Sequence, residues 1–188
     1  CIIYFMKDPI VQAGDPVLRL KAKPLSKSDI ASAKIKKLIK RMKAVLDKEE
    51  FGVALAAPQV GEPVRLFVIA GKVFKEEDAE ENTPTPPDKV FINPQLLRLS
   101  KKTAEMSEGC LSVRHKYGTV MRHQKASVKA QGEDGKPFTY HGTGLVAHIF
   151  QHECDHLDGV LYTDKAIKLE QDEDMKSARQ KLKEVRGV

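Results

Sequence analysis

The most informative stretch of the chain is TGLVAHIFQHECDHLDG, residues 143–159. Thr143 is a residue type that caps helix N-termini, and Gly159 is the type that commonly follows a helix end. The residues between the two are apolar on several sides, which is typical of a helix buried within a fold. We therefore predict a helix from about Thr143 to Leu157 at the centre of the structure.

Within this predicted helix, the HExxH pattern places two histidines four residues apart. At that spacing His152 and His156 project from the same face, so both can bind one metal ion. Glu153 lies beside the ion, where its carboxylate can take a proton from the attacking water. Two buried core histidines are the alternative, but a buried helix carrying HExxH favours the metal. Cys154 faces away from the ligand side, so we expect it to pack in the core.

Two histidines leave the ligand set incomplete, and the third ligand defines the class of enzyme. A metzincin protease needs a third histidine where this chain has Tyr162, which excludes that class. A zinc endopeptidase of another HExxH type would use a downstream glutamate, and Glu170 and Glu173 lie at a workable separation. Cys110, within EGCLS at residues 108–112, lies beside a glycine at the end of a predicted strand and would supply a thiolate. We favour Cys110 and keep the zinc endopeptidase as the alternative.

The rest of the sequence predicts an α+β fold in one domain spanning residues 1–188. Ser28 is a suitable N-cap for an N-terminal amphipathic helix. The apolar stripe of this helix consists of Ile35, Leu38, Ile39, Met42, Val45 and Leu46. Asp134-Gly135 predicts a hairpin turn, and we expect antiparallel sheets packed around the central helix. A further helix is expected from Glu170 to the C-terminus. The predicted strands are Arg65–Ala70, Val90–Asn93, Ala126–Gln131 and Pro137–His141.

The composition argues against several classes of protein. A chain of 188 residues with 41% hydrophobic residues can bury one core. It has no apolar run near the roughly eighteen residues of a membrane span, and the opening CIIYFM is too short for an export signal. Three cysteines argue against a disulfide scaffold and for a reducing compartment. The net charge of +6 is mildly basic, but no nucleic-acid-binding motif accompanies it, so we expect no direct DNA binding.

Three segments together resemble the peptide deformylase family. They are GVALAAPQ at residues 52–59, EGCLS at 108–112 and QHECDH at 151–156, in the order of that family. The resemblance covers about residues 8–165. It implies an α+β fold and removal of the N-formyl group from the formylmethionine of nascent chains, with release of formate. It also implies one divalent ion, natively Fe(II) with Zn, Ni or Co as substitutes, and a cytoplasmic location, or an organellar one in a eukaryote.

The resemblance further implies roles for individual residues. The implied metal ligands are Cys110, His152 and His156. Glu153 would pass a proton from the attacking water to the leaving amine. The backbone N–H of Leu111 and the side-chain amide of Gln59 would donate hydrogen bonds to the oxyanion. A hydrophobic pocket is expected for the methionine side chain. The residues expected at the substrate are Val53, Ala54, Gly109, Leu145 and Ile149.

Several positions near these motifs carry further expectations. Ala54 stands where the family usually has glycine, and its methyl group would narrow the substrate cleft. Residues 114–117 are expected to form a loop beside that cleft. We expect Arg122 to pair with Asp155 in support of the metal site. His148, one turn before the first histidine ligand, is expected at the pocket rim or behind a ligand.

The C-terminal segment, residues 175–188, is basic, with five Lys or Arg against one acidic residue. A cationic helix here would be attracted to RNA-rich surfaces. The ribosome, where formylmethionyl chains emerge, is therefore a predicted partner alongside the N-formylmethionyl peptide substrate. A solvated helix face is the alternative, and no membrane partner is expected.

Overall fold

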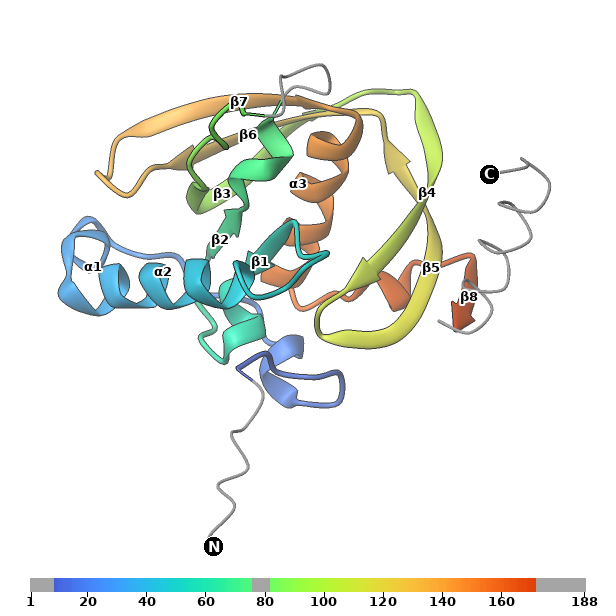
Figure 1. Ribbon diagram of the computed structural model, residues 1–188, viewed down its shortest axis with the longest axis horizontal. Coiled ribbons are helices and arrows are strands. Elements are labelled where there is room, and N and C mark those ends of the chain that lie inside the picture. The colour runs from blue at the N-terminus through green and yellow to red at the C-terminus, as the bar shows by residue number, and fades with distance from the viewer. Residues whose placement is uncertain (1–8, 76–81, 172–188) are drawn as a thin grey trace, which may run out of the picture.

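The computed structural model describes residues 9–75 and 82–171, whose arrangement is shown in Figure 1. The structure is a mixed fold of helices and antiparallel sheets, which confirms the predicted fold class at that level. A five-stranded and a three-stranded sheet are both in contact with helix α3 (Gly144–Leu157). Among the described residues, no helix is both long enough and apolar enough to cross a membrane.

The N-terminal helical region consists of two helices rather than one. They are α1 (Lys27–Ala31) and α2 (Ala33–Leu46). The predicted N-cap, Ser28, is wrong because Ser26 caps α1 and Ser32 caps α2, and the extended backbone of Ser32 interrupts the helix. The predicted apolar stripe is confirmed, since α2 buries all six of its residues. These residues pack in a core cluster with Leu55, Leu66 and Ile92.

The larger sheet has its strands in the order β1-β2-β3-β6-β7, and every pairing is antiparallel. The strands are β1 (Ala54–Ala56), β2 (Leu66–Ile69), β3 (Lys89–Leu99), β6 (Lys125–Gln131) and β7 (Pro137–Thr143). Four of them match the predicted strands, and Gly135, with a φ of 76°, forms the predicted β6–β7 turn. β3 runs past its predicted end at Asn93, because a register shift after Ile92 accommodates Asn93 and Pro94.

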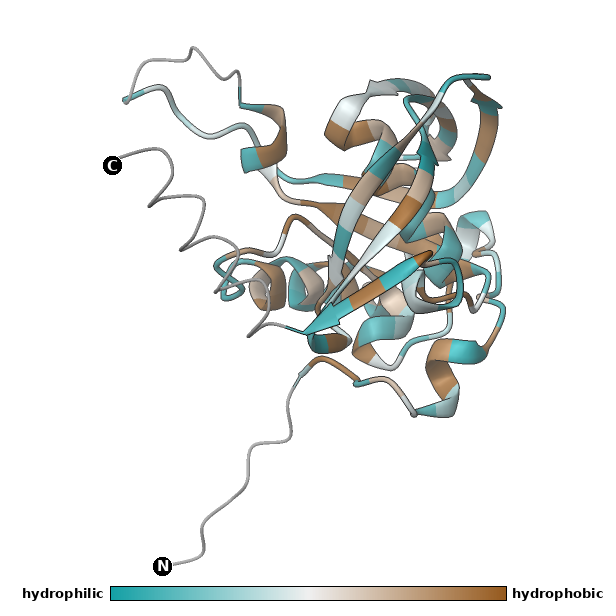
Figure 2. Cartoon of the chain, turned by 90° about the vertical axis from the view of Figure 1, so that its right-hand side faces the viewer, coloured by the Kyte–Doolittle hydropathy of each residue, from teal (hydrophilic) through white to brown (hydrophobic). Residues whose placement is uncertain are grey.

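The smaller sheet has the order β4-β5-β8 and faces the viewer in Figure 2, where hydrophilic and hydrophobic bands alternate along its strands. The strands are β4 (Thr103–Cys110), β5 (Val113–His123) and β8 (Lys168–Gln171). Residues 114–117 lie within β5, so the predicted loop is wrong; residues 114–116 are three consecutive exposed positions, without the alternation that is typical of a strand. The predicted helix does not begin at Glu170, because this residue lies in β8 and pairs with Tyr117 of β5. The rest of that helix, including segment 175–188, lies outside the described residues.

Helix α3 packs its apolar side against the larger sheet. Its Ala147, Phe150, Cys154 and Leu157 belong to one buried cluster with Phe67 and Phe91. The rings of Phe67 and Phe91 stack with centroids 4.8 Å apart, and Phe150 meets Phe91 edge-on at 5.3 Å. Thr143 and Gly159 flank the helix as predicted, and Cys154 is in the core as predicted. This packing fixes the helix and directs its histidines toward the smaller sheet.

Short 3-10 helices occur at η1 (Pro16–Arg19), η2 (Ala57–Val60), η3 (Gly71–Phe74) and η4 (Tyr162–Asp164).

Candidate metal centre

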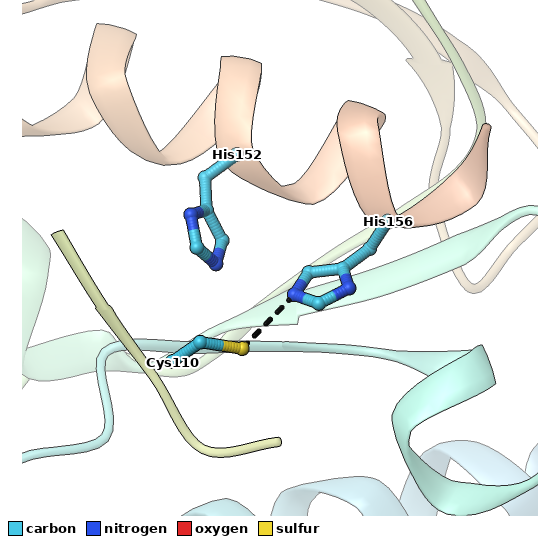
Figure 3. A group of neighbouring side chains, drawn as sticks. All are labelled: Cys110, His152 and His156. Atoms are coloured by element: carbon cyan, nitrogen blue, oxygen red, sulfur yellow. Dashed lines mark hydrogen bonds between the residues drawn. The ribbon is translucent and has the colours of Figure 1, made fainter. Parts of the chain in front are cut away.

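His152 and His156 project from α3 toward Cys110, the last residue of β4, as Figure 3 shows. The ligand atoms of the three side chains lie within 4.8 Å of one another, and Cys110 Sγ is 3.2 Å from His156 Nε2. The structure therefore brings together the three residues predicted as metal ligands. One thiolate with two imidazoles is a donor set that suits divalent transition metals.

The surroundings of the Cys110 sulfur favour a thiolate. Burial would raise the pKa of this thiol, but the imidazoles of His156 and His152 lower the pKa to about 5. The Ser112 backbone N–H and the Gln59 side-chain nitrogen lie 3.4 and 3.5 Å from the sulfur. Because the thiolate is the form of cysteine that binds metals, these residues fit a divalent ion.

Glu153 is buried beside the two histidines, with 4% of its surface exposed. Its Oε2 atom has no hydrogen-bond partner among the described residues. Burial raises the pKa of the Glu153 carboxyl to about 7. A buried carboxyl group with an open oxygen and a pKa near neutrality can both accept and release a proton, which general acid–base catalysis requires.

Glu108 links the metal ligands to β5, and no role was predicted for it from the sequence. Its carboxylate accepts hydrogen bonds from His152 Nδ1 at 2.6 Å, from His148 Nε2 at 2.7 Å, and from Arg122 at 2.6 and 3.1 Å. Burial would raise the pKa of Glu108, but these bonds hold it well below its usual range. A carboxylate on one ring nitrogen of His152 leaves the other for a metal. The sequence feature that points to Glu108 is its spacing from Cys110, because residues two apart in a strand lie on the same face of the sheet.

Arg122 is a buried bridge between the two sides of this network. It holds Glu108 through Nε and Nη2, and its Nη1 donates to Asp155 at 2.7 Å, as predicted. Lys165 also donates to Asp155, at 2.7 Å. Each guanidinium nitrogen of Arg122 therefore has a carboxylate partner. Charged groups are buried in proteins when they are paired in this way.

The residues predicted to stabilise an oxyanion lie next to Cys110. Gln59, in η2, is 2% exposed, and its carbonyl oxygen accepts from the Ala56 N–H at 2.8 Å. That bond turns the amide nitrogen toward Ser112 Oγ, 3.2 Å away, and toward the Cys110 sulfur. Leu111 follows Cys110 directly, in the turn between β4 and β5.

The five residues predicted at the substrate lie in different environments. Ile149 is buried in the core cluster, Ala54 is buried in β1, and Val53 is half-buried beside it. Leu145 is 50% exposed at the start of α3. A side chain at Gly109 would come within 3.0 Å of the Tyr117 ring. None of the five is among the residues that line a nearby cavity of about 320 Å³. Its lining includes Ala104, Met106, Lys125, Gly144 and His148.

The zinc endopeptidase alternative is not favoured by this geometry. Glu170 lies in β8 and pairs with Tyr117 across the sheet. Within residues 9–75 and 82–171, the group that could hold a metal is made of Cys110, His152 and His156, without Glu170. Glu173 lies outside the described residues.

Comparison with known proteins agrees with this geometry. The family model described as polypeptide deformylase matches residues 7–172. A peptide deformylase of Christiangramia forsetii is 38% identical over 165 residues, covering 86% of this chain and 82% of that protein. The chloroplastic peptide deformylase 1A of Solanum lycopersicum is 38% identical over 162 residues, covering 83% of this chain and 58% of that protein.

A solved structure is similar over most of the chain. It is the class I type b peptide deformylase from Acinetobacter baumannii bound to Met-Ala-Ser, which is 31% identical. The match has a TM-score of 0.73 and covers 84% of this chain and 96% of that one. The family match spans both sheets, α3 and all three residues of the metal-binding group. This chain therefore belongs to the polypeptide deformylase family.

Proposed function

We propose that this protein removes the N-formyl group from N-formylmethionyl peptides by metal-dependent hydrolysis and releases formate. Membership of the polypeptide deformylase family supports this activity. The observation that carries it is the group formed by Cys110, His152 and His156 beside the buried Glu153. A divalent ion held by those three residues would polarise the formyl carbonyl and activate water for attack.

Glu153 is proposed to be the proton carrier of the reaction. As water attacks the formyl carbon, its carboxylate takes a proton from that water and later gives it to the leaving amine nitrogen. The burial of Glu153 and its pKa near 7 support this role, because a carboxylate with an ordinary pKa would be a weaker base toward the attacking water.

Gln59 and Leu111 are proposed to stabilise the negative charge that develops on the formyl oxygen. The Gln59 amide is fixed by its bond to the Ala56 N–H, so its N–H groups are already oriented toward Cys110. The backbone N–H of Leu111 lies next along the chain. Donors that are in place before the reaction need no reorganisation when charge appears.

The substrate site is proposed to include the five predicted residues. They are Val53, Ala54, Gly109, Leu145 and Ile149. The half-exposed Leu145 is available to an incoming side chain, whereas Ile149 would act from within the core. The Acinetobacter baumannii structure contains Met-Ala-Ser, a peptide that begins with methionine, and this supports a methionine subsite here. Since the formyl carbon carries only hydrogen, a crowded site would exclude larger acyl groups.

The proposed native ion is Fe(II), with zinc, nickel or cobalt as substitutes. One thiolate ligand and an ion open to water would make the iron form sensitive to oxygen, and Cys110 would be oxidised with it. We expect the protein with its native ion to lose activity in air much faster than protein reconstituted with nickel or cobalt. Equal lifetimes in air would instead indicate native zinc.

We also propose that residues 1–188 form one catalytic domain in which α3 is the central helix. The cytoplasm, or an organelle in a eukaryote, is the proposed location. The ribosome is the proposed partner of segment 175–188. Deleting that segment should weaken binding to ribosomes at low salt and leave hydrolysis of short peptides unchanged. Equal ribosome binding by both forms would contradict this partner.

The activity itself is tested by formate release from a formyl-Met peptide. The metal-loaded protein should release formate, and the release should stop when a chelator removes the ion. The same peptide carrying an acetyl group is the matched control and should be a much poorer substrate. Formate release that persists unchanged in the metal-free protein would contradict the proposed function.

A further inference from the structure

His148 has one side in the metal network and the other at a cavity. It lies on α3 one turn before His152, and its side chain is 10% exposed. Its Nε2 lies 2.7 Å from Glu108 Oε1, and the residue also forms part of the wall of the cavity of about 320 Å³. Met106 and Gly144 line the same cavity.

The hydrogen bonds around Glu108 determine which nitrogen of His148 carries a proton. An ionised carboxylate only accepts hydrogen bonds, so the nitrogen that faces it must be the donor. Nε2 of His148 therefore carries hydrogen, as does Nδ1 of His152, which lies 2.6 Å from Glu108 Oε2. The carboxylate is thus tied to α3 at two points one helical turn apart.

Arg122 alone does not fix Glu108 along the direction of the helix. Its Nε and Nη2 contact one carboxylate oxygen each, so the guanidinium holds the plane of the group from one side. His148 and His152 hold the same two oxygens from the side of α3. Without His148, Oε1 keeps only its contact with Arg122, and the link between the carboxylate and α3 depends on the single hydrogen bond from His152 to Oε2.

We propose that His148 is a positioning residue for the metal centre: through Glu108 it holds the ring of His152 in the orientation that binds the ion. The inference rests on the metal site of the proposed function. It adds a third layer behind the ion, in which a helix residue that cannot reach the metal sets the geometry of one that can. Partners of this kind tune affinity for the ion.

The test measures Co(II) affinity, by competition with a chelator, and the visible absorption of the Co(II)-loaded protein. His148→Leu removes the donor, and its dissociation constant for Co(II) should rise about tenfold. His148→Gln places an amide N–H where Nε2 stands, so its affinity should stay within about threefold of the unaltered protein. His141→Leu, at an exposed histidine bonded to Ser127, is the matched control and should leave the Co(II) affinity unchanged.

None of these substitutions introduces a side chain with more non-hydrogen atoms than histidine, and thermal melting tests whether the variants fold. If His148→Leu does not melt cooperatively, His148→Asn replaces it, because its shorter amide cannot reach Glu108. Weak Co(II) binding by His148→Asn with normal binding by His148→Gln supports the proposal. Normal binding by His148→Leu or His148→Asn, or equally weak binding by His148→Gln, would overturn it. An unaltered protein that binds no Co(II) would overturn both the metal site and this role.

Discussion

Cys110 and Cys154 are the two cysteines among the described residues, both are free, and their environments give them opposite chemistry. Two imidazoles next to Cys110 lower its pKa to about 5 against the effect of burial. Cys154 packs among Phe67, Phe150 and Leu157, and burial raises its pKa to about 12. One is a thiolate poised to bind a metal, and the other behaves as a small apolar side chain.

The same contrast divides the two sides of α3. The side that faces the larger sheet is fixed by aromatic packing and carries no ionised group of the metal network. The side that faces β4 and β5 buries His156, Glu153 and the Glu108–Arg122 pair. Burying charges is costly, so the apolar side supplies the stability that the polar side requires. Stability and chemistry are thus separated on one helix, and each can be changed alone.

The largest effect is expected on the polar side, from Glu153→Gln. An amide cannot take a proton from water, so turnover should fall by about 10²- to 10⁴-fold, while the ion stays bound. Formate release and metal content measured on the same sample test both parts. Glu105→Gln, at an exposed position of β4, is the matched control. Turnover within about tenfold of the unaltered protein, a difference of ~1.4 kcal/mol, would show that another group is the base.

A smaller effect is expected on the alkylation rates of the two thiols, which compare Cys110 with Cys154 directly. In the metal-free protein, Cys110 should react with iodoacetamide at a rate that hardly changes between pH 7 and 9. With a pKa of about 5, this thiol is already ionised throughout that range. Cys154, with a pKa of about 12 and 4% exposure, should react only after unfolding. Mass spectrometry of the peptides distinguishes the two, and a Cys110 rate that rises tenfold per pH unit would contradict the assignment.

The smallest effect is expected on the apolar side, from Cys154→Ala. Loss of one small buried group should lower the free energy of unfolding by about 1–2 kcal/mol. Denaturant unfolding measures that loss. Metal content and formate release at 25 °C should match the unaltered protein. A loss of the ion from this variant would show that the two sides of α3 are not independent.

Local patterns predicted the parts of the site that lie on one element. The spacing of His152 and His156 requires only helical geometry, and Cys154 was placed correctly from the same period. The position of Cys110 came from its neighbours in EGCLS and from the joint presence of the other motifs. The role of Glu108 was missed because it depends on β4 lying against α3, a contact between segments far apart in the chain.

The errors in the fold have different causes. Ser28 is a good cap by composition, but Ser26 and Ser32 lie at the turns that the chain makes. β5 has three consecutive exposed residues at 114–116, so the alternation of the strand is hidden there. Glu170 stands in an acidic run that favours a helix start, yet β5 pairs with it as a strand. The strand pairing of Glu170 depends on a partner distant in sequence, whereas the caps at Ser26 and Ser32 are local contacts.

The central claim is that Cys110, and not Cys154, completes a binding site for one divalent ion. Metal content per chain, measured after purification of the unaltered protein, Cys110→Ala and Cys154→Ala under identical conditions, tests it most directly. We predict about one ion per chain for the unaltered protein and for Cys154→Ala, and almost none for Cys110→Ala, because two imidazoles alone leave the ligand set incomplete. A full complement of metal in Cys110→Ala would contradict the claim.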